Sequence, residues 1–318
     1  MRLQLRTAVT AVLVLAVALA APAAATDSDL QLVPARIDLT KEVDKSVTIP
    51  PELVTPEAAR NIGPGSALLI TIPDEGRFGC SANFVWSGGG KTYLGAAGHC
   101  FIPADTKSTH GPGADYDASG VTVQVCVENC ETGFRSGITL LGTYVTLGKV
   151  AYARQTDPTG TEDVGNDFGV VEVPSSLAHL IRPSLPVWGG PHGADTLKAG
   201  AFGCHYGNGV VVGETVVTKA RVGLGGGGDD DFWMGDFAAA FGDSGSGLVK
   251  CKQESATFKG EGAVGVLTHI GLSVCPCNVN FKKQTFTAQN GVTFGTTTAR
   301  AIEMAREAGL SLSLVSAG

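Results

Sequence analysis

The sequence predicts an all-β protein, and its composition and its pattern of short apolar runs are the observations behind this prediction. The chain of 318 residues contains 44 glycines, and only 17% of its residues are charged, which favours a turn-rich β protein over a helical one. From residue 67 onward, short apolar and β-branched runs alternate with clusters of Gly, Pro, Asp and Asn. Runs of this length and spacing are typical of an antiparallel barrel or sandwich.

The expected strands form two sets. The first set covers residues 67–72, 82–86, 93–97, 121–127, 143–153 and 168–173, and the second covers 209–217, 247–250, 263–268 and 292–294. Between them lie Pro174, Pro183, Pro186 and Pro191, which predict a connection between two units.

One helix is expected near the C-terminus. Ala301, Ile302, Ala305 and Ala308 lie at helical spacing. A residue within 296–298 can cap the start of this helix, and Gly309 fits just past its end.

The N-terminal residues read as an export signal over 1–25. Two arginines precede an apolar stretch from Ala8 to Ala21, and the run Ala23-Ala24-Ala25 supplies the small-residue cleavage pattern. The apolar stretch approaches the length of a membrane span, but its alanine-rich end and Pro22 favour cleavage after Ala25 over an uncleaved anchor. We therefore expect a secreted protein with no stable membrane association after cleavage.

Residues 26–62 are rich in proline and show no sustained period, which predicts an extended arm or a short propeptide. The net charge of −7 and the pI of about 5.4 argue against a phosphate-binding surface, so we expect no nucleic-acid partner. Three consecutive aspartates at 229–231 lack the alternating ligand spacing of a calcium loop and read as an acidic loop.

The chain has eight cysteines, an even number that favours disulfides in an exported protein. They are Cys80, Cys100, Cys126, Cys130, Cys204, Cys251, Cys275 and Cys277. The competing interpretation is a zinc site made by Cys126, Cys130, Cys275 and Cys277.

Two glycine-rich motifs carry the strongest chemical signal. One is Gly-Asp-Ser-Gly-Ser-Gly at 242–247, and the other is Gly-Ala-Ala-Gly-His-Cys at 95–100. A serine hydroxyl needs an imidazole to take its proton and N–H groups to hold an oxyanion. Ser244 is the candidate nucleophile, and the N–H groups of Gly242 and Ser244 are the candidate oxyanion hole.

These motifs, with Asp167 in the run Asn-Asp-Phe-Gly-Val-Val at 166–171, appear in the order His99, Asp167, Ser244. In this order and context the chain resembles the chymotrypsin-fold serine peptidases of the exported bacterial type, over roughly residues 63–310. The resemblance implies two packed antiparallel β-barrels with a C-terminal α-helix. Residues 63–185 would form the first barrel, with His99 and Asp167, and residues 186–318 the second barrel, with Ser244 and the helix.

The resemblance also assigns roles to single residues. His99 would act as general base and then general acid, and Asp167 would orient its imidazole. Asp163, in a more polar stretch, is the alternative carboxylate, and Thr268 would support the aspartate by a hydrogen bond. Asp243 would be a buried carboxylate that needs a partner, for which Arg221 is a candidate.

For the cysteines, the resemblance pairs Cys80 with Cys100 and Cys204 with Cys251. Local closure then leaves Cys126 with Cys130 and Cys275 with Cys277. The last pair would close a very small, strained ring.

By the same mapping, the specificity pocket has Ala238, Ala239, Ala240 and Phe241 on one wall and Thr268, His269, Ile270 and Gly271 on the other. No carboxylate lies at Ala238, the expected floor, so a preference for Lys or Arg lacks its counter-charge. We expect small or medium apolar side chains to be preferred. His269 keeps an alternative open, in which an imidazole receives an acidic side chain.

The predicted function is that of a secreted serine endopeptidase that acts on protein or peptide substrates as a monomer, without a metal or other cofactor. The alternative from another class is a catalytically silent binding protein of the same fold. An esterase of the α/β-hydrolase type is excluded, because a Gly-x-Ser-x-Gly elbow does not fit the Gly-Asp-Ser-Gly context of Ser244.

Overall fold

A computed structural model describes residues 30–38, 45–48, 62–103, 106–111, 115–134, 138–158, 163–209, 219–274, 280–281 and 284–318. The predicted signal at 1–25, both cysteines at 275 and 277, and nearly all of the expected strand at 209–217 lie outside these residues. In the part of the chain that is described, no helix combines the length and the hydropathy that crossing a bilayer requires.

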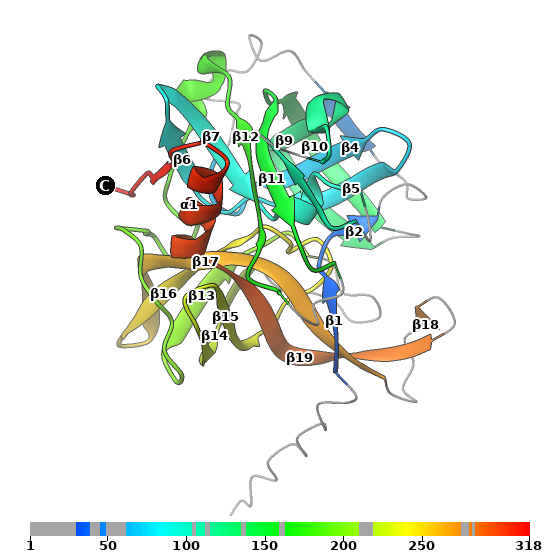
Figure 1. Cartoon of the computed structure of the whole chain (residues 1–318). Helices are drawn as coiled ribbons and strands as arrows, with labels where there is room; N and C mark the ends of the chain where they lie inside the picture. The colour runs from blue at the N-terminus through cyan, green and yellow to red at the C-terminus, as the bar shows by residue number, and fades with distance from the viewer. Residues whose placement is uncertain are drawn as a thin grey trace, which may run out of the picture.

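The described chain is built from three β-sheets and one α-helix, which confirms the predicted all-β class (Figure 1). Two six-stranded sheets make up the first half of the molecule. One has the order β2 (Ile37–Asp38), β5 (Gly76–Ser81), β4 (Ala67–Ile72), β9 (Thr122–Phe134), β10 (Ile138–Thr146) and β3 (Lys45–Thr48). The other has the order β20 (Ser313–Leu314), β6 (Val85–Gly88), β7 (Lys91–Ala96), β12 (Asp167–Glu172), β11 (Val150–Gln155) and β8 (Ser108–His110).

The two sheets of the first half enclose one apolar core. Leu68 and Val125 from the first sheet belong to the same buried cluster as Leu94 and Val170 from the second. Along these strands the neighbours are paired antiparallel, with the short β3 as a parallel exception against β10. The expected strand at 143–153 is in fact two strands, β10 and β11, because the chain turns at residues 147–149 from one sheet to the other.

The second half is a closed ring of strands. Its eight-stranded sheet has the order β1 (Leu30–Pro34), β17 (Thr257–Val274), β16 (Gly247–Glu254), β13 (Phe202–Tyr206), β14 (Ala220–Gly228), β15 (Phe232–Phe237), β19 (Gln284–Thr297) and β18 (Asn280–Phe281). An additional pairing between β17 and β19 closes six of these strands into a barrel, and all of its pairings are antiparallel.

The interior of this barrel contains two large aromatic rings that lie against glycines. Trp233 and Phe237 are almost fully buried, with ring centroids 5.8 Å apart. A Cβ on Gly235 would lie 2.2 Å from the Phe237 ring, and one on Gly295 would lie 2.5 Å from the Trp233 ring. Glycine inside these strands therefore makes room for the rings that fill the barrel.

The C-terminal helix α1 (Thr298–Glu307) begins where the sequence predicts. The side chain of Thr297 caps it by accepting a hydrogen bond from the N–H of Arg300 at 3.1 Å, and Gly309 follows the helix with φ +79°. Its buried face, including Ala301 and Met304, joins the main core. The described residues also include three short helical turns, η3 (Gly98–Cys100), η4 (Ala118–Gly120) and η5 (Ser175–Leu180).

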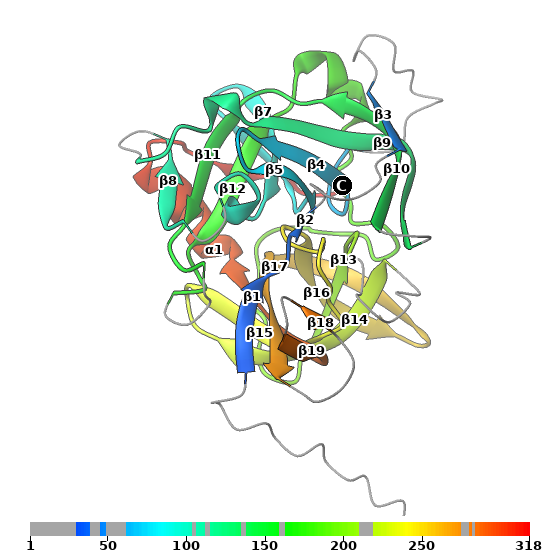
Figure 2. The same cartoon turned by 90° about the vertical axis from the view of Figure 1, so that its right-hand side faces the viewer.

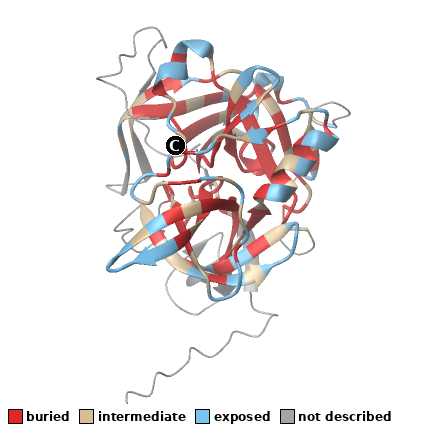
Figure 3. Ribbon diagram, turned by 90° about the vertical axis from the view of Figure 1, so that its left-hand side faces the viewer, coloured by how far each residue is buried: buried red, intermediate tan, exposed pale blue. Residues whose placement is uncertain are grey.

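Both ends of the described chain cross between the halves. β1, from the N-terminal segment, is an edge strand of the second-half sheet, whereas β20, near the C-terminus, pairs with β6 in the first half. Figure 2 shows β1 against the lower sheet and β2 continuing upward to the first half. Buried residues follow the inner strands, and exposed residues mark the hairpin ends and the outer face of α1 (Figure 3).

Three disulfides tie these strands: Cys80 to Cys100, Cys126 to Cys130, and Cys204 to Cys251. These are three of the four expected pairs. Because the sulfurs of Cys126 and Cys130 are bonded to each other, they offer no thiolates, and the zinc alternative is wrong on this point.

The long-range bridge Cys204–Cys251 and the local bridge Cys126–Cys130 should contribute differently to the free energy of unfolding. Replacement of Cys204 and Cys251 by alanine opens a loop of 47 residues, and the chain-entropy model gives a cost of about 4 kcal/mol. The same replacement at Cys126 and Cys130 opens a loop of 4 residues, for an expected cost of about 2 kcal/mol. Urea unfolding of the two double variants checks this order, and a larger loss for the local bridge would contradict it.

Candidate active site

His99 is positioned directly after β7, in the 3₁₀ turn η3. The turn lies close to β11, since a Cβ on Gly98 would come within 2.0 Å of the Arg154 carbonyl oxygen, so only glycine fits there. The disulfide between Cys80 and Cys100 fixes the other side of the turn to β5. The turn that carries the imidazole is therefore fixed by close backbone packing on one side and by a disulfide on the other.

Asp167 is the first residue of β12, and only 2% of its surface is exposed. Its main chain is tied to the second half of the molecule through Thr296. The N–H of Asp167 donates to Thr296 Oγ1 at 3.1 Å, and that hydroxyl donates to the Asp167 carbonyl oxygen at 2.9 Å. Nothing in the sequence predicts a contact between Thr296 and Asp167, because β19 reaches Asp167 only in the folded barrel.

The alternative carboxylate, Asp163, has other partners. It accepts hydrogen bonds from the Thr156 hydroxyl at 2.7 Å and from the Asn166 side-chain amide. The expected support from Thr268 also has a different geometry. The Thr268 hydroxyl donates to the carbonyl oxygen of Phe294 at 3.4 Å and lies 2.9 Å from His269 Nδ1.

Ser244 lies in the turn between β15 and β16. Gly245 has φ +89°, and a Cβ at this residue would lie 2.2 Å from the Ser81 carbonyl oxygen, so the turn requires glycine. The Ser81 N–H donates to the Ser244 carbonyl oxygen at 2.8 Å, which attaches the turn to the first half. Gly242, with φ +100°, supplies the second positive φ of the turn.

The structure brings the three predicted residues into one hydrogen-bonded line. Ser244 Oγ lies 2.7 Å from His99 Nε2, and His99 Nδ1 lies 2.5 Å from Asp167 Oδ2. The second carboxylate oxygen of Asp167 accepts the His99 backbone N–H at 3.0 Å. This geometry allows an imidazole to take the serine proton while a carboxylate holds its tautomer.

Asp167 stays charged although it is buried. Burial alone raises the pKa of its carboxyl group, but the charge and hydrogen bond of His99 outweigh burial and bring the pKa below its ordinary value. The carboxylate is therefore ionised throughout the neutral range, where it fixes the imidazole.

The predicted oxyanion-hole donors converge on a single atom. The N–H of Gly242 and the N–H of Ser244, the latter at 3.5 Å, both point to the carbonyl oxygen of Ala35. Two N–H groups aimed at one carbonyl oxygen are the arrangement that stabilises a developing oxyanion. The sequence did not predict that residue 35 would lie there.

The buried Asp243 beside the candidate nucleophile pairs with Arg221, as expected. The Arg221 guanidinium donates to Asp243 Oδ2, and the two side chains are 5% and 0% exposed. The N–H groups of Gly209, at 2.7 Å, and Ala240, at 2.8 Å, complete the carboxylate's hydrogen bonds. Through these contacts Asp243 holds the turn that carries Ser244.

The residues expected to line the specificity pocket lie around this turn and β17. Ile270 is buried, while Phe241 is half-buried and packs against the same apolar cluster. Ala238 is exposed, and its carbonyl oxygen accepts hydrogen bonds from His205 at 3.0 Å and from Arg221 at 3.3 Å.

His269 is fully buried, and its ring centroid lies 6.1 Å from that of His99. Burial lowers the pKa of His269 to about 4, in spite of the opposing charge of Asp167. A neutral imidazole is a poor counter-charge for an acidic substrate side chain, which weighs against the alternative preference for glutamate.

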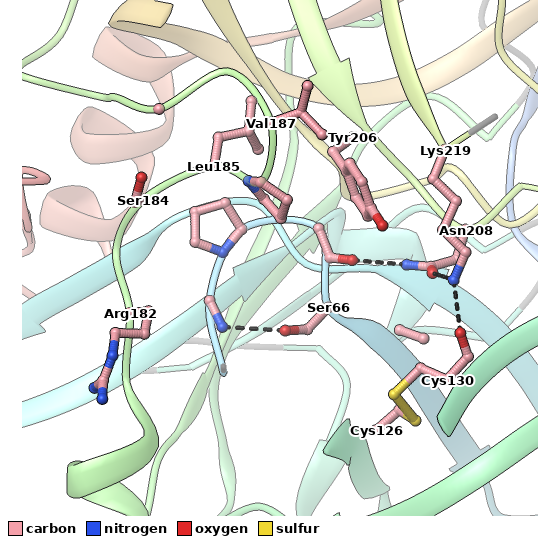
Figure 4. A pocket seen from close by; sticks show the side chains of 16 residues that line it. Ser66, Cys126, Cys130, Arg182, Ser184, Leu185, Val187, Tyr206, Asn208 and Lys219 are labelled. Atoms are coloured by element: carbon pink, nitrogen blue, oxygen red, sulfur yellow. Dashed lines mark hydrogen bonds between the residues drawn. A yellow bond between two sulfur atoms is a disulfide. The ribbon is translucent and has the colours of Figure 1, made fainter. Parts of the chain in front are cut away.

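A separate cavity of about 750 Å³ is lined by none of the three candidate catalytic residues (Figure 4). Its lining includes Arg182, Tyr206, Asn208 and Lys219. Lys219 Nζ donates to Asn208 Oδ1 and to the Cys130 carbonyl oxygen, both at 2.9 Å. Asn208 in turn donates its backbone N–H to Ser81 Oγ at 2.8 Å, so the wall of the cavity braces the Ser244 turn.

Among the described residues, the group with metal-ligand spacing is Cys80, His99 and Cys100. Both of these cysteines are in one disulfide, so they do not provide thiolate ligands.

The buried ion pair predicts a large loss of stability when only one partner is removed. We expect Arg221→Met to destabilise the fold by about 3–5 kcal/mol, because it leaves the Asp243 carboxylate buried without its cation. Urea unfolding of this variant, with Arg221→Lys as the charge-conserving control, measures the effect. The double variant with Arg221→Met and Asp243→Asn should lose less free energy of unfolding than the two single variants lose together. Strict additivity of the two losses would contradict the pairing.

Two buried histidines predict acid lability. Burial lowers the pKa of His205, and likewise that of His269, to about 4, whereas an imidazole in the unfolded chain has a pKa of about 6.5. Between these values the unfolded chain binds more protons, so stability falls as pH falls. The expected cost is about 2 kcal/mol per histidine between about pH 7.5 and pH 5.

Urea unfolding of Ser244→Ala, which lacks the candidate nucleophile, measures the slope across this pH range. In the His205→Gln variant the free energy of unfolding should depend less steeply on pH, because the unfolded chain takes up about one proton fewer over this range. A stability that does not change with pH in this window would contradict the prediction.

Comparisons with family models and with curated proteins find no match to this chain. Comparison with solved structures finds likenesses to bacterial proteases. Protease A of Thermobifida fusca is 16% identical over 81% of this chain and 100% of its own, with a TM-score of 0.40. The Cellulomonas bogoriensis chymotrypsin is 16% identical over 80% and 100%, with a TM-score of 0.39. The protease Anisep of Arthrobacter nicotinovorans is 13% identical over 79% and 97%, with a TM-score of 0.45.

At these identities and TM-scores the likenesses assign no activity to this chain. Its own sheet order is more informative: two stacked sheets, a closed six-stranded antiparallel ring and a C-terminal helix, with the candidate residues where the halves meet. On this topology, the described chain has the two-barrel fold of the chymotrypsin type.

Proposed function

We propose that this protein is a serine endopeptidase that hydrolyses peptide bonds through an acyl-enzyme on Ser244. The observation that carries the proposal is the convergence of two features at Ser244: the Ser244–His99–Asp167 line of hydrogen bonds and the two N–H groups of the Ser244 turn. A nucleophile, a base and an oxyanion hole in this geometry are sufficient for acyl transfer.

In the first half-reaction, Ser244 Oγ attacks the carbonyl carbon of the scissile bond while His99 Nε2 takes the hydroxyl proton. The N–H groups of Gly242 and Ser244 hold the oxyanion of the tetrahedral intermediate. His99 then gives the proton to the leaving amine, the C–N bond breaks, and the acyl group remains on Ser244 as an ester.

In the second half-reaction, His99 takes a proton from water, which attacks the ester carbonyl carbon. The same two N–H groups hold the second oxyanion, and the proton returns to Ser244 Oγ as the ester breaks. Throughout, the charge of Asp167 stabilises the imidazolium that forms in each step. None of these steps uses a metal or another cofactor.

The alternative is a silent binding protein with the same fold. The complete line of hydrogen bonds and the short distance of 2.7 Å between Ser244 Oγ and His99 Nε2 favour the enzyme. Secretion is part of the proposal: three disulfides are more typical of an exported protein than of a cytosolic one. The peptide substrate would place a small or medium apolar side chain before the scissile bond, against Ile270 and Phe241.

The proposal is tested with variants of the three residues. Ser244→Ala should lower peptide hydrolysis by about 10⁴-fold or more and abolish covalent labelling by a fluorophosphonate. Asp167→Asn should lower turnover by about 10⁴-fold near neutral pH, because the amide stabilises the wrong imidazole tautomer.

Asp163→Asn is the matched control for the carboxylate, since Asp163 lies near Asp167 in sequence but bonds to Thr156 and Asn166 instead. It should retain near-normal turnover. A folded wild-type protein that neither hydrolyses any peptide of a broad panel nor reacts with the fluorophosphonate would support the silent alternative.

A further inference from the structure

The N-terminal segment 30–38 passes through the cleft that contains the candidate catalytic residues. β1 adds to β17 in an antiparallel register that pairs Val33 with Ile270 and Pro34 with His269. Beyond residue 36 the segment pairs with the other half, where Ile37 of β2 lies opposite Gly79 of β5. Figure 2 shows β1 and β2 in this order, crossing from one half to the other. The segment therefore binds on both sides of Ser244 as an extended strand, which is how sheet edges recognise peptides.

The backbone of Ala35 is placed at the reacting position. Its N–H donates to the Thr268 carbonyl oxygen at 3.0 Å. Its carbonyl oxygen accepts the N–H of Gly242 and the N–H of Ser244, the two donors of the proposed oxyanion hole. The bond that follows this carbonyl, between Ala35 and Arg36, is therefore the one presented to Ser244.

The side chains on the two sides of this bond occupy different surroundings. Ala35 is fully buried and belongs to the apolar cluster that includes Trp233, Phe237 and Ile270. A methyl group thus occupies the expected specificity pocket, beside the apolar side chain of Ile270.

Arg36 follows this bond, and residues of the first half bind its side chain. Its Nη1 donates to the carbonyl oxygen of His99 at 2.6 Å and to that of Ile102 at 2.9 Å. The guanidinium carbon lies 4.1 Å from the centre of the Phe78 ring. Two carbonyl oxygens and an aromatic face together select a cation, and the planar guanidinium matches both at once.

We propose that the chain is its own first substrate: Ser244 cleaves the bond between Ala35 and Arg36, so that the processed protein begins at Arg36. The inference rests on the proposed peptidase function and adds to it the bond that is cut and the residues that are recognised. The same contacts define the preferred substrate class, a peptide with a small apolar residue before the scissile bond and arginine after it.

The chemistry balances without any group from outside except water. Ser244 Oγ bonds to the Ala35 carbonyl carbon, the bond to the Arg36 nitrogen breaks, and His99 moves the serine proton to that nitrogen. Water then displaces Ser244, which leaves a carboxylate on Ala35 and a free amine on Arg36. Until the segment ending in Ala35 leaves, it covers Ser244, whose exposed fraction is 0%. The uncut chain is thus blocked toward other substrates.

The first experiment measures the N-terminus of the full-length chain. Wild type, purified after expression, should begin at Arg36 by N-terminal sequencing and intact mass, whereas Ser244→Ala should remain uncut at this bond. The rate of cleavage should not depend on protein concentration, because the segment lies in its own cleft. A wild-type chain that is active but begins elsewhere, or a Ser244→Ala chain cut at Arg36 as well, overturns the self-cleavage.

The second experiment tests the two binding places. Ala35→Trp should slow self-cleavage by about 100-fold, because the ring exceeds the pocket, while the matched Ala35→Ser should cleave nearly as wild type does. Arg36→Glu should slow it by about 10-fold or more, because a carboxylate faces two carbonyl oxygens. Arg36→Lys should slow it less, because an ammonium group keeps the charge and loses the planar contact with Phe78. Equal cleavage rates for the two Ala35 variants overturn the role of the pocket. Equal rates for the two Arg36 variants overturn the recognition of the cation.

The third experiment separates this inference from the proposed function. The processed enzyme is given the peptide Leu-Val-Pro-Ala-Arg-Ile-Asp and variants with Trp for Ala or Glu for Arg. We expect cleavage between Ala and Arg, with the two variants slower by the factors above. Fluorophosphonate labelling of Ser244 together with poor cleavage of this peptide overturns the inference and leaves the peptidase intact. Absence of both labelling and hydrolysis of any peptide overturns the peptidase itself.

Discussion

The proposed chemistry depends on the contact between the two halves of the molecule. His99 and Asp167 belong to the first half, and Ser244 belongs to the second. The Ser81 N–H holds the Ser244 turn from across the interface, and Thr296 holds the Asp167 backbone in the opposite direction. Because each half makes hydrogen bonds to the main chain of the other's candidate residue, the distance of 2.7 Å between Ser244 Oγ and His99 Nε2 depends on how the two halves pack together.

Two buried carboxylates near this interface have different partners and different consequences. Asp167 bonds to a residue that can change its charge, so its own charge can stabilise an imidazolium. Asp243 bonds to an arginine that is always charged, and to two backbone N–H groups. The first pair is arranged for proton transfer, and the second holds the shape of the turn that donates the two N–H groups.

The N-terminal segment 30–38 contacts both halves of the molecule at the candidate active site. Its strand β1 pairs with β17. The Ala35 methyl group lies in an apolar cluster, and the Arg36 guanidinium lies over the Phe78 ring. Its two short pairings lie on opposite halves, so the segment spans the interface as an extended peptide does. The contacts that hold this segment in place are the ones that we expect to bind a peptide substrate.

The sequence by itself determined the β class, the capped C-terminal helix and the order of the His99, Asp167 and Ser244 motifs, because these depend on local composition and spacing. It could not predict β14, since this strand is rich in glycine and lacks the usual β-forming residues. The need for glycine at residue 223 appears only in the folded barrel, where a Cβ would lie 2.6 Å from the Phe237 ring. Only the tertiary structure decided that Thr296 reaches Asp167 and that the Ala35 carbonyl oxygen reaches the N–H groups of Gly242 and Ser244. Both contacts join residues more than a hundred positions apart, and such contacts follow from how sheets close and pack, which local patterns do not encode.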